Sequence, residues 1–472
     1  MAPGSHSTAN LTHATDSASL LPPVAARPAT SLDNSVYHSL TSVLEFADQD
    51  QLFWWTETAS IVAKLMESAG YDVESQRRYL LLYHAHILAA LGPKQTPCPS
   101  DRSASSPWKS FMTDDHTPIE ISWNLGANRS VVRLSIEPIG PFAGTSFDPF
   151  NQRPALELLQ QLPGIDLQLF YYFRDWFFID DDDVDDVLKR RPAGEHSSQL
   201  FVAFDFDGGK VTTKAYIFPL LKALETGIPV LDLVSTAIRN LDEPALSVSP
   251  GWNVLEDFIR SCPIASRPKL EFIAIDCVAP EKSRIKIYVR TPHTALEKVK
   301  DVFTLGGRLN DQTIQTALGM LEELWRLVLD LPDGLRDSDE LHPRDENSAG
   351  HRTSGVLFNF EIKPGAALPE PKLYIPVRHY ARSDLDIARG LTAFFRRRGW
   401  TSLAETYTDT LKETFPHHPL AESTSTHTYI VFAFKKTTGV YLTAYYNPQV
   451  YARPKPSEKL EWTKDRLRGH RL

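Results

Sequence analysis

The sequence predicts an α+β fold in which ten antiparallel strands close into one β-barrel and α-helices surround it. Three observations support this prediction. Five pairs of short alternating segments recur along the chain, a tight turn joins the members of each pair, and helical sequence fills the gaps between pairs. Tight turns indicate antiparallel pairing, and closing such a sheet into a barrel removes its exposed edges.

The strand pairs recur roughly every 70 to 85 residues, which indicates one repeated unit rather than several domains. The pairs occupy 118–138, 199–219, 269–291, 354–378 and 427–447. Their turns lie at 126–129, 207–209, 280–283, 363–369 and 436–439.

Apolar residues at helical spacing predict the helices between these pairs. One helix runs through Leu52, Trp55 and Met66 to a C-cap at Gly70, and a second covers 74–91. Further helices are expected at 153–163, 165–177, 219–241, 250–260, 294–302, 308–330, 382–398 and 402–415. Residues 331–353, which contain Pro, Gly and many charges, are expected to form a long loop.

The 472 residues are expected to comprise one barrel domain at 34–453 with a segment on each side. Residues 1–33 are rich in Ser, Thr, Ala and Pro, which predicts disorder. Residues 454–472 form a charged C-terminal tail.

Composition excludes several classes of partner. A net charge of −9 gives no overall basic field, so neither nucleic acid nor an anionic membrane is an expected partner. No apolar run reaches the roughly 18 residues of a membrane span. The three cysteines lack metal-ligand spacing and the N-terminus lacks a signal-peptide pattern, so we expect a cytoplasmic protein with free thiols.

The polar faces of the strands carry a repeated pattern of a cation followed two residues later by a tyrosine. Residues two apart in a strand share a face, and the opposite, aliphatic faces need helices to cover them. The polar faces should therefore point into the barrel. The alternative is a solvent-facing polar side, but such a side has no reason to repeat Lys-x-Tyr on three strands. The cations are Arg133, Lys214, Arg284, Lys286 and Lys372, and the tyrosines are Tyr216, Tyr288, Tyr374, Tyr441 and Tyr445.

This inner surface predicts a reaction. Five converging cations would repel one another unless an anion joined them, and Lys and Arg suit phosphate oxygens. Tyrosine rings can stabilise a nearby carbocation through their π faces. The combination predicts an allylic diphosphate as ligand and transfer of its prenyl group.

At this level of detail the chain resembles the fungal aromatic prenyltransferases of the dimethylallyltryptophan synthase type, whose fold is called the ABBA or PT barrel. The resemblance covers roughly 36–450. Besides the strands above, it rests on Phe53-Trp54-Trp55, Ser68-Ala69-Gly70-Tyr71, Leu91-Gly92-Pro93 and residues 113–123, which include Glu120.

The resemblance implies a role for each residue. Glu120 would hold the N–H or phenolic O–H of the acceptor and help to remove its proton. Lys214 would be catalytic and would bind diphosphate together with Arg133, Arg284, Lys286 and Lys372. Tyr216, Tyr288, Tyr374, Tyr441 and Tyr445 would shield the allyl cation. Many relatives that prenylate tryptophan carry Gln where Lys372 stands, so the acceptor is not fixed by this comparison.

The expected donor is dimethylallyl or geranyl diphosphate, and the expected acceptor is an indole compound of secondary metabolism. A phenolic, quinone or polyketide acceptor is the alternative, and a non-catalytic barrel that binds a small ligand is the alternative from another class. No metal is expected to be required, with Mg²⁺ or Ca²⁺ as an optional enhancer. The protein is expected to be a monomer or a homodimer.

One acidic run offers a competing interpretation. Asp181, Asp182 and Asp185 match the Asp-Asp-x-x-Asp pattern with which all-helical prenyl synthases hold Mg²⁺ on a diphosphate. Those enzymes need a second acidic motif, and this sequence has none. We interpret the run as a solvated helix start, which the helix dipole favours.

Overall fold

The computed structural model describes residues 35–94, 108–127, 129–179, 184–241, 247–345 and 348–452. These described residues form one compact unit, which contains all of the strands described below. The expected disordered segment 1–33 and the expected charged tail 454–472 lie outside the described residues. The domain boundaries therefore stay predictions.

Ten strands form the closed barrel that the sequence predicts, and each is antiparallel to both neighbours. Neighbours in sequence are neighbours in the sheet, and β1 pairs with β10 to close it. The strands are β1 (Ile119–Leu125), β2 (Val131–Ile136), β3 (Leu200–Asp207), β4 (Lys210–Ile217), β5 (Lys269–Asp276), β6 (Ile285–Thr291), β7 (Val356–Ile362), β8 (Glu370–Ile375), β9 (His427–Lys435) and β10 (Gly439–Tyr446).

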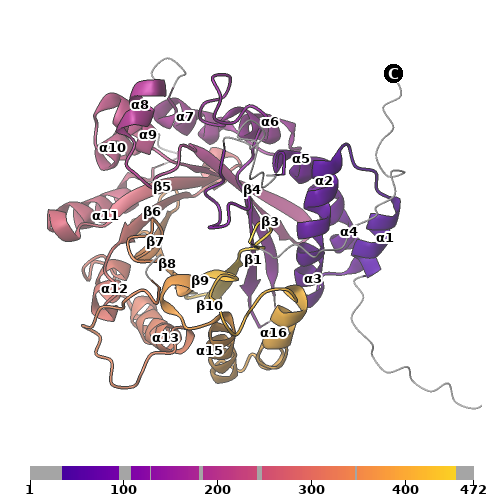
Figure 1. Ribbon diagram of the computed structural model, residues 1–472. Coiled ribbons are helices and arrows are strands. Elements are labelled where there is room, and N and C mark those ends of the chain that lie inside the picture. Colours follow the sequence, from indigo (N-terminus) through magenta and orange to yellow (C-terminus); the bar gives the residue numbers. More distant parts are fainter. Residues whose placement is uncertain are drawn as a thin grey trace, which may run out of the picture. The chain divides into compact units, whose positions relative to one another are not determined.

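Helices surround the barrel, as Figure 1 shows. Before β1 come α1 (Ser35–Val43), α2 (Gln49–Trp54), α3 (Ser60–Ser68), α4 (Val73–Leu82) and α5 (Leu88–Ala90), with π-helical turns at Trp55–Ala59 and Tyr83–Ile87. Between later pairs lie α6 (Arg153–Gln161), α7 (Gln168–Phe177), α8 (Val184–Arg190), α9 (Leu220–Thr226), α10 (Val230–Asn240), α11 (Ser249–Ser261), α12 (Leu296–Phe303), α13 (Gln312–Val328), α14 (Val377–Tyr380), α15 (Asp384–Arg397) and α16 (Thr401–Thr414).

Most helices lie where the apolar spacing places them, with two differences. The helix expected over 219–241 is divided, because Gly227 ends α9 with a φ of +72° and Pro229 then precedes α10. The short α14 was not expected, since its four residues are too few to show a period. Gly70 lies just after α3 with a φ of +79°, which confirms its expected place at the end of that helix.

The two faces of the sheet belong to different apolar regions. Outward residues such as Ile121, Trp123 and Phe358 are buried in the large core between barrel and helices. A separate inner cluster contains Tyr288 and Leu357. The predicted inward direction of the tyrosine face is thus confirmed.

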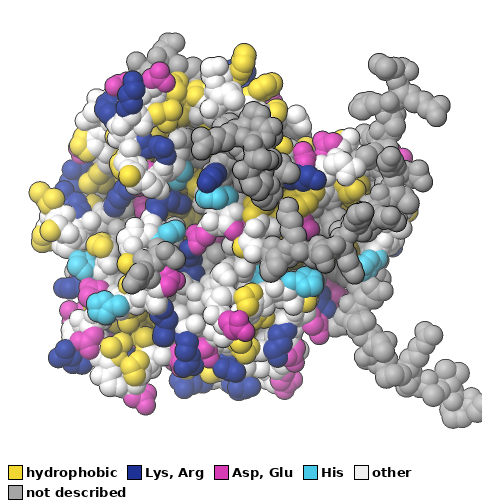
Figure 2. Space-filling model, viewed as in Figure 1, with side chains coloured by type: hydrophobic (Ala, Val, Ile, Leu, Met, Phe, Trp, Pro, Cys, Tyr) yellow, Lys and Arg dark blue, Asp and Glu magenta, His cyan; other side chains and the backbone are white. Residues whose placement is uncertain are grey.

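Within the described residues, no helix combines the length and the apolarity that crossing a membrane requires. Acidic and basic side chains are interspersed on the face shown in Figure 2. Cys262 and Cys277 are free thiols.

Candidate active site

The inner face of the barrel is arranged in two layers. Because neighbouring strands are antiparallel, all even-numbered strands run the same way through the barrel. On β4, β6 and β8 the tyrosine follows its lysine by two residues. Each tyrosine therefore lies one step, about 6.6 Å, further along the barrel than its lysine. The repeat produces a layer of cations and, next to it, a layer of tyrosines.

Four of the predicted tyrosines form a continuous chain of ring contacts across the even-numbered strands. The ring centroids of Tyr216 and Tyr288 are 5.9 Å apart, those of Tyr288 and Tyr374 are 5.8 Å apart, and those of Tyr374 and Tyr445 are 6.0 Å apart. Burial raises the pKa of all four hydroxyls well above the usual value. They therefore present neutral, electron-rich rings to the lumen.

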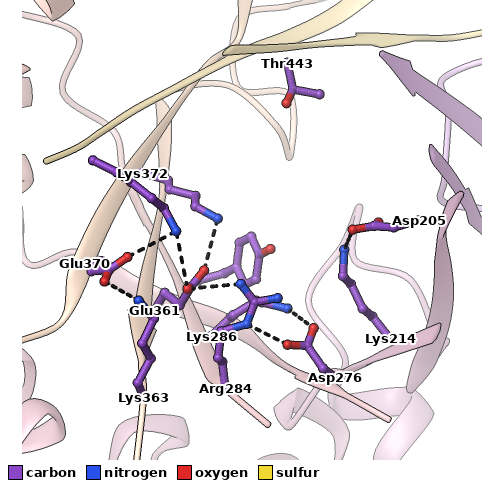
Figure 3. A network of polar contacts seen from close by, with 12 residues as sticks. Asp205, Lys214, Asp276, Arg284, Lys286, Glu361, Lys363, Glu370, Lys372 and Thr443 are labelled. Atoms are coloured by element: carbon purple, nitrogen blue, oxygen red, sulfur yellow. Dashed lines mark hydrogen bonds and ion pairs between the residues drawn. The ribbon is translucent and has the colours of Figure 1, made fainter. Parts of the chain in front are cut away.

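The cation layer contains all five predicted cations, and each is paired with a carboxylate from a neighbouring strand. Figure 3 shows Lys214, Arg284, Lys286 and Lys372 beside their carboxylates. On β3, Asp205 lies 3.1 Å from Arg133 Nε and 2.5 Å from Lys214 Nζ. On β5, Asp276 lies 2.6 Å from Arg284 Nε and 2.5 Å from Lys286 Nζ.

The third carboxylate is Glu361 on β7. It accepts hydrogen bonds from Arg284 Nη1 and Lys372 Nζ, each at 3.1 Å. Lys435 Nζ on β9, a cation that the sequence analysis did not single out, lies 3.9 Å from it. Strand register explains these pairs. Arg133 is directly opposite Asp205. Lys214, Lys286 and Lys372 each meet a carboxylate two residues beyond their direct partners, which are Ala203, Ala274 and Asn359.

The carboxylates are ionised. Burial alone would raise the pKa of Asp276, but Lys286 and Arg284 outweigh burial and hold that pKa at about 2. Neighbouring cations likewise keep the pKa of Asp205 and of Glu361 well below the usual range despite burial. Lys435 is balanced by Glu370, which lies 3.3 Å from its Nζ. The five predicted cations against the three carboxylates then leave two positive charges unbalanced.

Tyr441 lies in the cation layer, apart from the other tyrosines. Its ring is 4.9 Å from Lys372 Nζ and 5.6 Å from the Arg133 guanidinium carbon. Burial raises the pKa of Tyr441, but Arg133 and Lys372 outweigh it and lower the pKa to about 7. This tyrosine is therefore placed to interact with the cations directly.

Glu120 lies on β1 and lines the cavity that opens above the tyrosines. Its Oε1 accepts a hydrogen bond of 2.6 Å from Thr428 Oγ1 of β9. Desolvation raises the pKa of Glu120 to about 7, and the Thr428 bond opposes that rise. Near neutral pH this carboxyl can therefore accept or release a proton.

The cavity has a volume of about 1020 Å³ and is lined by Glu120, Thr428 and the four-tyrosine chain. Phe201 and Phe272 add to its wall, because their rings stack on Tyr216 and Tyr288 with centroids 4.1 and 4.3 Å apart. Its rim comes from residues 108–116, 191–197 and 350–353. The sequence analysis missed Phe201, Phe272 and Thr428, although all three lie on strands.

The acidic run gives no metal site in the described residues. Asp181 and Asp182 lie outside them, and Asp185 stands in the first turn of α8. Among the residues that are described, no three His, Cys, Asp or Glu side chains are grouped so that they could hold a metal ion.

Comparison with known proteins identifies the family. The family model for tryptophan dimethylallyltransferase matches residues 50–410. The chain belongs to this family. The match spans eight of the ten barrel strands, β1 to β8, together with α15 and most of α16, and β9 and β10 follow the matched range.

Individual relatives agree with this membership. The chain is 44% identical over 417 residues to a 7-dimethylallyltryptophan synthase of Aspergillus fumigatus, a match that covers 85% of each protein. It is 36% identical to a 4-O-dimethylallyl-L-tyrosine synthase of Claviceps purpurea, over 84% of this chain and 87% of the relative. The crystal structure of NotF in complex with brevianamide F and DMSPP superposes with a TM-score of 0.74 at 27% identity, over 89% of this chain and 99% of NotF.

The family and its relatives confirm the predicted ABBA barrel and the predicted enzyme class, an aromatic prenyltransferase. The alternative of a non-catalytic barrel is set aside, because the matched relatives are transferases.

Proposed function

We propose that this enzyme transfers a dimethylallyl group from its diphosphate to the aromatic ring of an indole compound. The observation that supports this proposal most directly is the cation layer with two unbalanced positive charges directly next to a layer of four tyrosines. An allylic diphosphate has the matching construction, with an anionic head next to a carbon that becomes cationic.

The five cations would bind and stabilise the departing diphosphate. Charge develops on the leaving oxygens in the transition state, where preorganised cations are most effective. Lys214 and Lys286 are less than one-tenth exposed, so little water screens them. The excess positive charge would be neutralised by the diphosphate itself, so we propose that a divalent metal is not required.

The four-tyrosine chain would shield the allyl cation from water and stabilise it through its π faces. The C1–O bond breaks with its electron pair staying on the diphosphate. The indole ring then attacks the allyl carbon, and loss of the ring proton to a base restores aromaticity. Tyr441, which lies among the cations, would contact the diphosphate rather than the allyl carbon.

Glu120 would hold the indole N–H, with Thr428 fixing the orientation of its carboxylate. A carboxylate that accepts this N–H makes the ring more electron-rich and so more nucleophilic. With a pKa of about 7, Glu120 is partly ionised at neutral pH and can also take up a proton.

The indole acceptor is favoured by the 44% identity to a tryptophan-prenylating relative. A phenolic acceptor is the second candidate, because a relative at 36% identity is named for a tyrosine ether. Geranyl diphosphate remains an alternative donor within a cavity of this size. The proposed setting is a cytoplasmic enzyme of fungal secondary metabolism.

The test is mass spectrometry of products formed from dimethylallyl or geranyl diphosphate with a panel of indoles and phenols. Glu120→Gln and Lys214→Ala are each expected to lower kcat/KM by more than tenfold, or about 1.4 kcal/mol. Activity is expected to persist in excess EDTA. Losses below tenfold in both variants, or strict dependence on Mg²⁺, would contradict the assigned roles.

A further inference from the structure

Asn359 on β7 carries a buried amide with no hydrogen-bond partner. The residue is 1% exposed, and neither its Nδ2 nor its Oδ1 bonds to any of the described residues. Buried polar groups in folded proteins are nearly always paired, so each exception calls for an explanation. The proposed function and the five predicted cations do not use this residue.

The Asn359 side chain points into the barrel. Its sequence neighbours Phe358 and Phe360 are buried in the outer core. Leu357 belongs to the inner cluster with the tyrosines, and Glu361 binds the cations. Since residues two apart share a face, Asn359 lies on the inner face between Leu357 and Glu361.

Strand register places Asn359 at the boundary between the two layers. Its direct partner on β6 is Tyr288, a member of the four-tyrosine chain. Its direct partner on β8 is Lys372, a member of the cation layer. The amide is therefore level with the junction between a bound diphosphate and its allyl group, if the donor lies as proposed above.

We propose that Asn359 is a further donor-binding residue, whose Nδ2–H donates a hydrogen bond to the diphosphate oxygen next to the breaking C1–O bond. This inference rests on the proposed function. As the bond breaks, its electron pair moves onto that oxygen, and the amide N–H stabilises the added charge without giving up its proton. The unpaired amide destabilises the fold of the ligand-free protein, and a hydrogen bond to the bound allylic diphosphate removes that penalty.

The experiment uses Asn359→Leu, which keeps the side-chain size and removes both unpaired polar atoms. Inorganic pyrophosphate is the probe, and its affinity is measured by calorimetry without turnover. Asn359→Leu is expected to bind pyrophosphate at least tenfold more weakly and to raise KM for dimethylallyl diphosphate or lower kcat, with acceptor KM within twofold. Asn359→Asp, which keeps the shape but turns a donor into an anion, is expected to lose more.

Melting without ligand separates this role from a structural one. The melting temperature of ligand-free Asn359→Leu is expected to be no lower than that of the wild type, because the leucine side chain has no polar atom that would be buried without a partner. The matched control is Asn124→Leu, since Asn124 Nδ2 on β1 donates to Leu442 O at 2.7 Å and to Thr443 Oγ1 at 3.1 Å. That variant is expected to melt lower.

Unchanged pyrophosphate affinity in both Asn359 variants, with normal wild-type binding, would overturn this assignment alone. A lower melting temperature of Asn359→Leu with unchanged affinity would show a structural role instead. Failure of the wild type to bind pyrophosphate or to turn over any allylic diphosphate would overturn the proposed function itself.

Discussion

The carboxylates of the cation layer make a sharp prediction about stability, and Glu361 is the best place to test it. Glu361 is 1% exposed and accepts hydrogen bonds from Arg284 and Lys372. Glu361→Gln keeps the side-chain size but removes one of three negative charges, so three rather than two positive charges are unbalanced. Removing one partner of a buried ion pair costs about 3–5 kcal/mol. Arg284 keeps its bond to Asp276, so we expect the lower end, about 3 kcal/mol.

Pyrophosphate should reverse this loss, because it supplies the missing negative charge. A ligand at one hundred times its Kd stabilises the folded state by about 2.7 kcal/mol. The variant is therefore expected to gain more stability from pyrophosphate than the wild type does. The measurement is chemical unfolding, followed by fluorescence, with and without pyrophosphate.

The matched control is Glu370→Gln on β8, whose side chain is 41% exposed and pairs with Lys363 and Lys435. An exposed pair contributes at most about 1 kcal/mol, so this variant should lose far less. Equal stability of Glu361→Gln and the wild type would refute the reasoning. So would a pyrophosphate effect that is no larger in the variant than in the wild type.

Three further outcomes follow from the structure. Burial raises the pKa of Glu120 from 4.5 to about 7, so the buried carboxyl destabilises the fold increasingly as the pH rises from about 4.5 to 7. The free energy of unfolding of Glu120→Gln should therefore exceed that of the wild type by about 1–3 kcal/mol at pH 8 and equal it at pH 4.5. Denaturant titrations at both pH values measure this difference. Tyr288→Phe keeps the ring and should retain kcat within about threefold, whereas Tyr288→Leu should lose at least tenfold and release more prenyl alcohol in a product assay. Asp384 is fully buried and accepts hydrogen bonds from the backbone and ring of His427. Asp384→Ala should therefore lower the free energy of unfolding by about 3 kcal/mol and leave kcat per folded molecule unchanged. A melting temperature equal to that of the wild type would contradict this.

The barrel and the two inner layers could be predicted because their signals are local. Alternation and turn residues mark each hairpin, and the Lys214–Tyr216 spacing alone fixes that both side chains share a face. The same counting places Tyr441 two steps deeper in the barrel than Tyr445, because it precedes Tyr445 by four residues. The sequence analysis gave both tyrosines the same role, and for Tyr441 that role stays a prediction.

The carboxylate partners were missed for a different reason. Each of the three carboxylates, Asp205, Asp276 and Glu361, interrupts an apolar strand segment at a position on the polar face of its strand. That position was the one feature of the sequence that could have indicated them. Which cation each one meets depends on register between strands. The contact of Glu120 with Thr428 joins residues 308 apart, and only closure of the barrel brings them together.

The direction of the even-numbered strands has a consequence for how such an enzyme can change. The hairpin turns, such as Gly208-Gly209 between β3 and β4, all lie at the cation end of the barrel, where a change of length would disturb the strand register. The long connections between hairpins all lie at the tyrosine end and supply the cavity rim. Insertions and deletions can therefore accumulate around the acceptor while the geometry that activates the donor stays fixed, and new acceptors become accessible to evolution without rebuilding the leaving-group site.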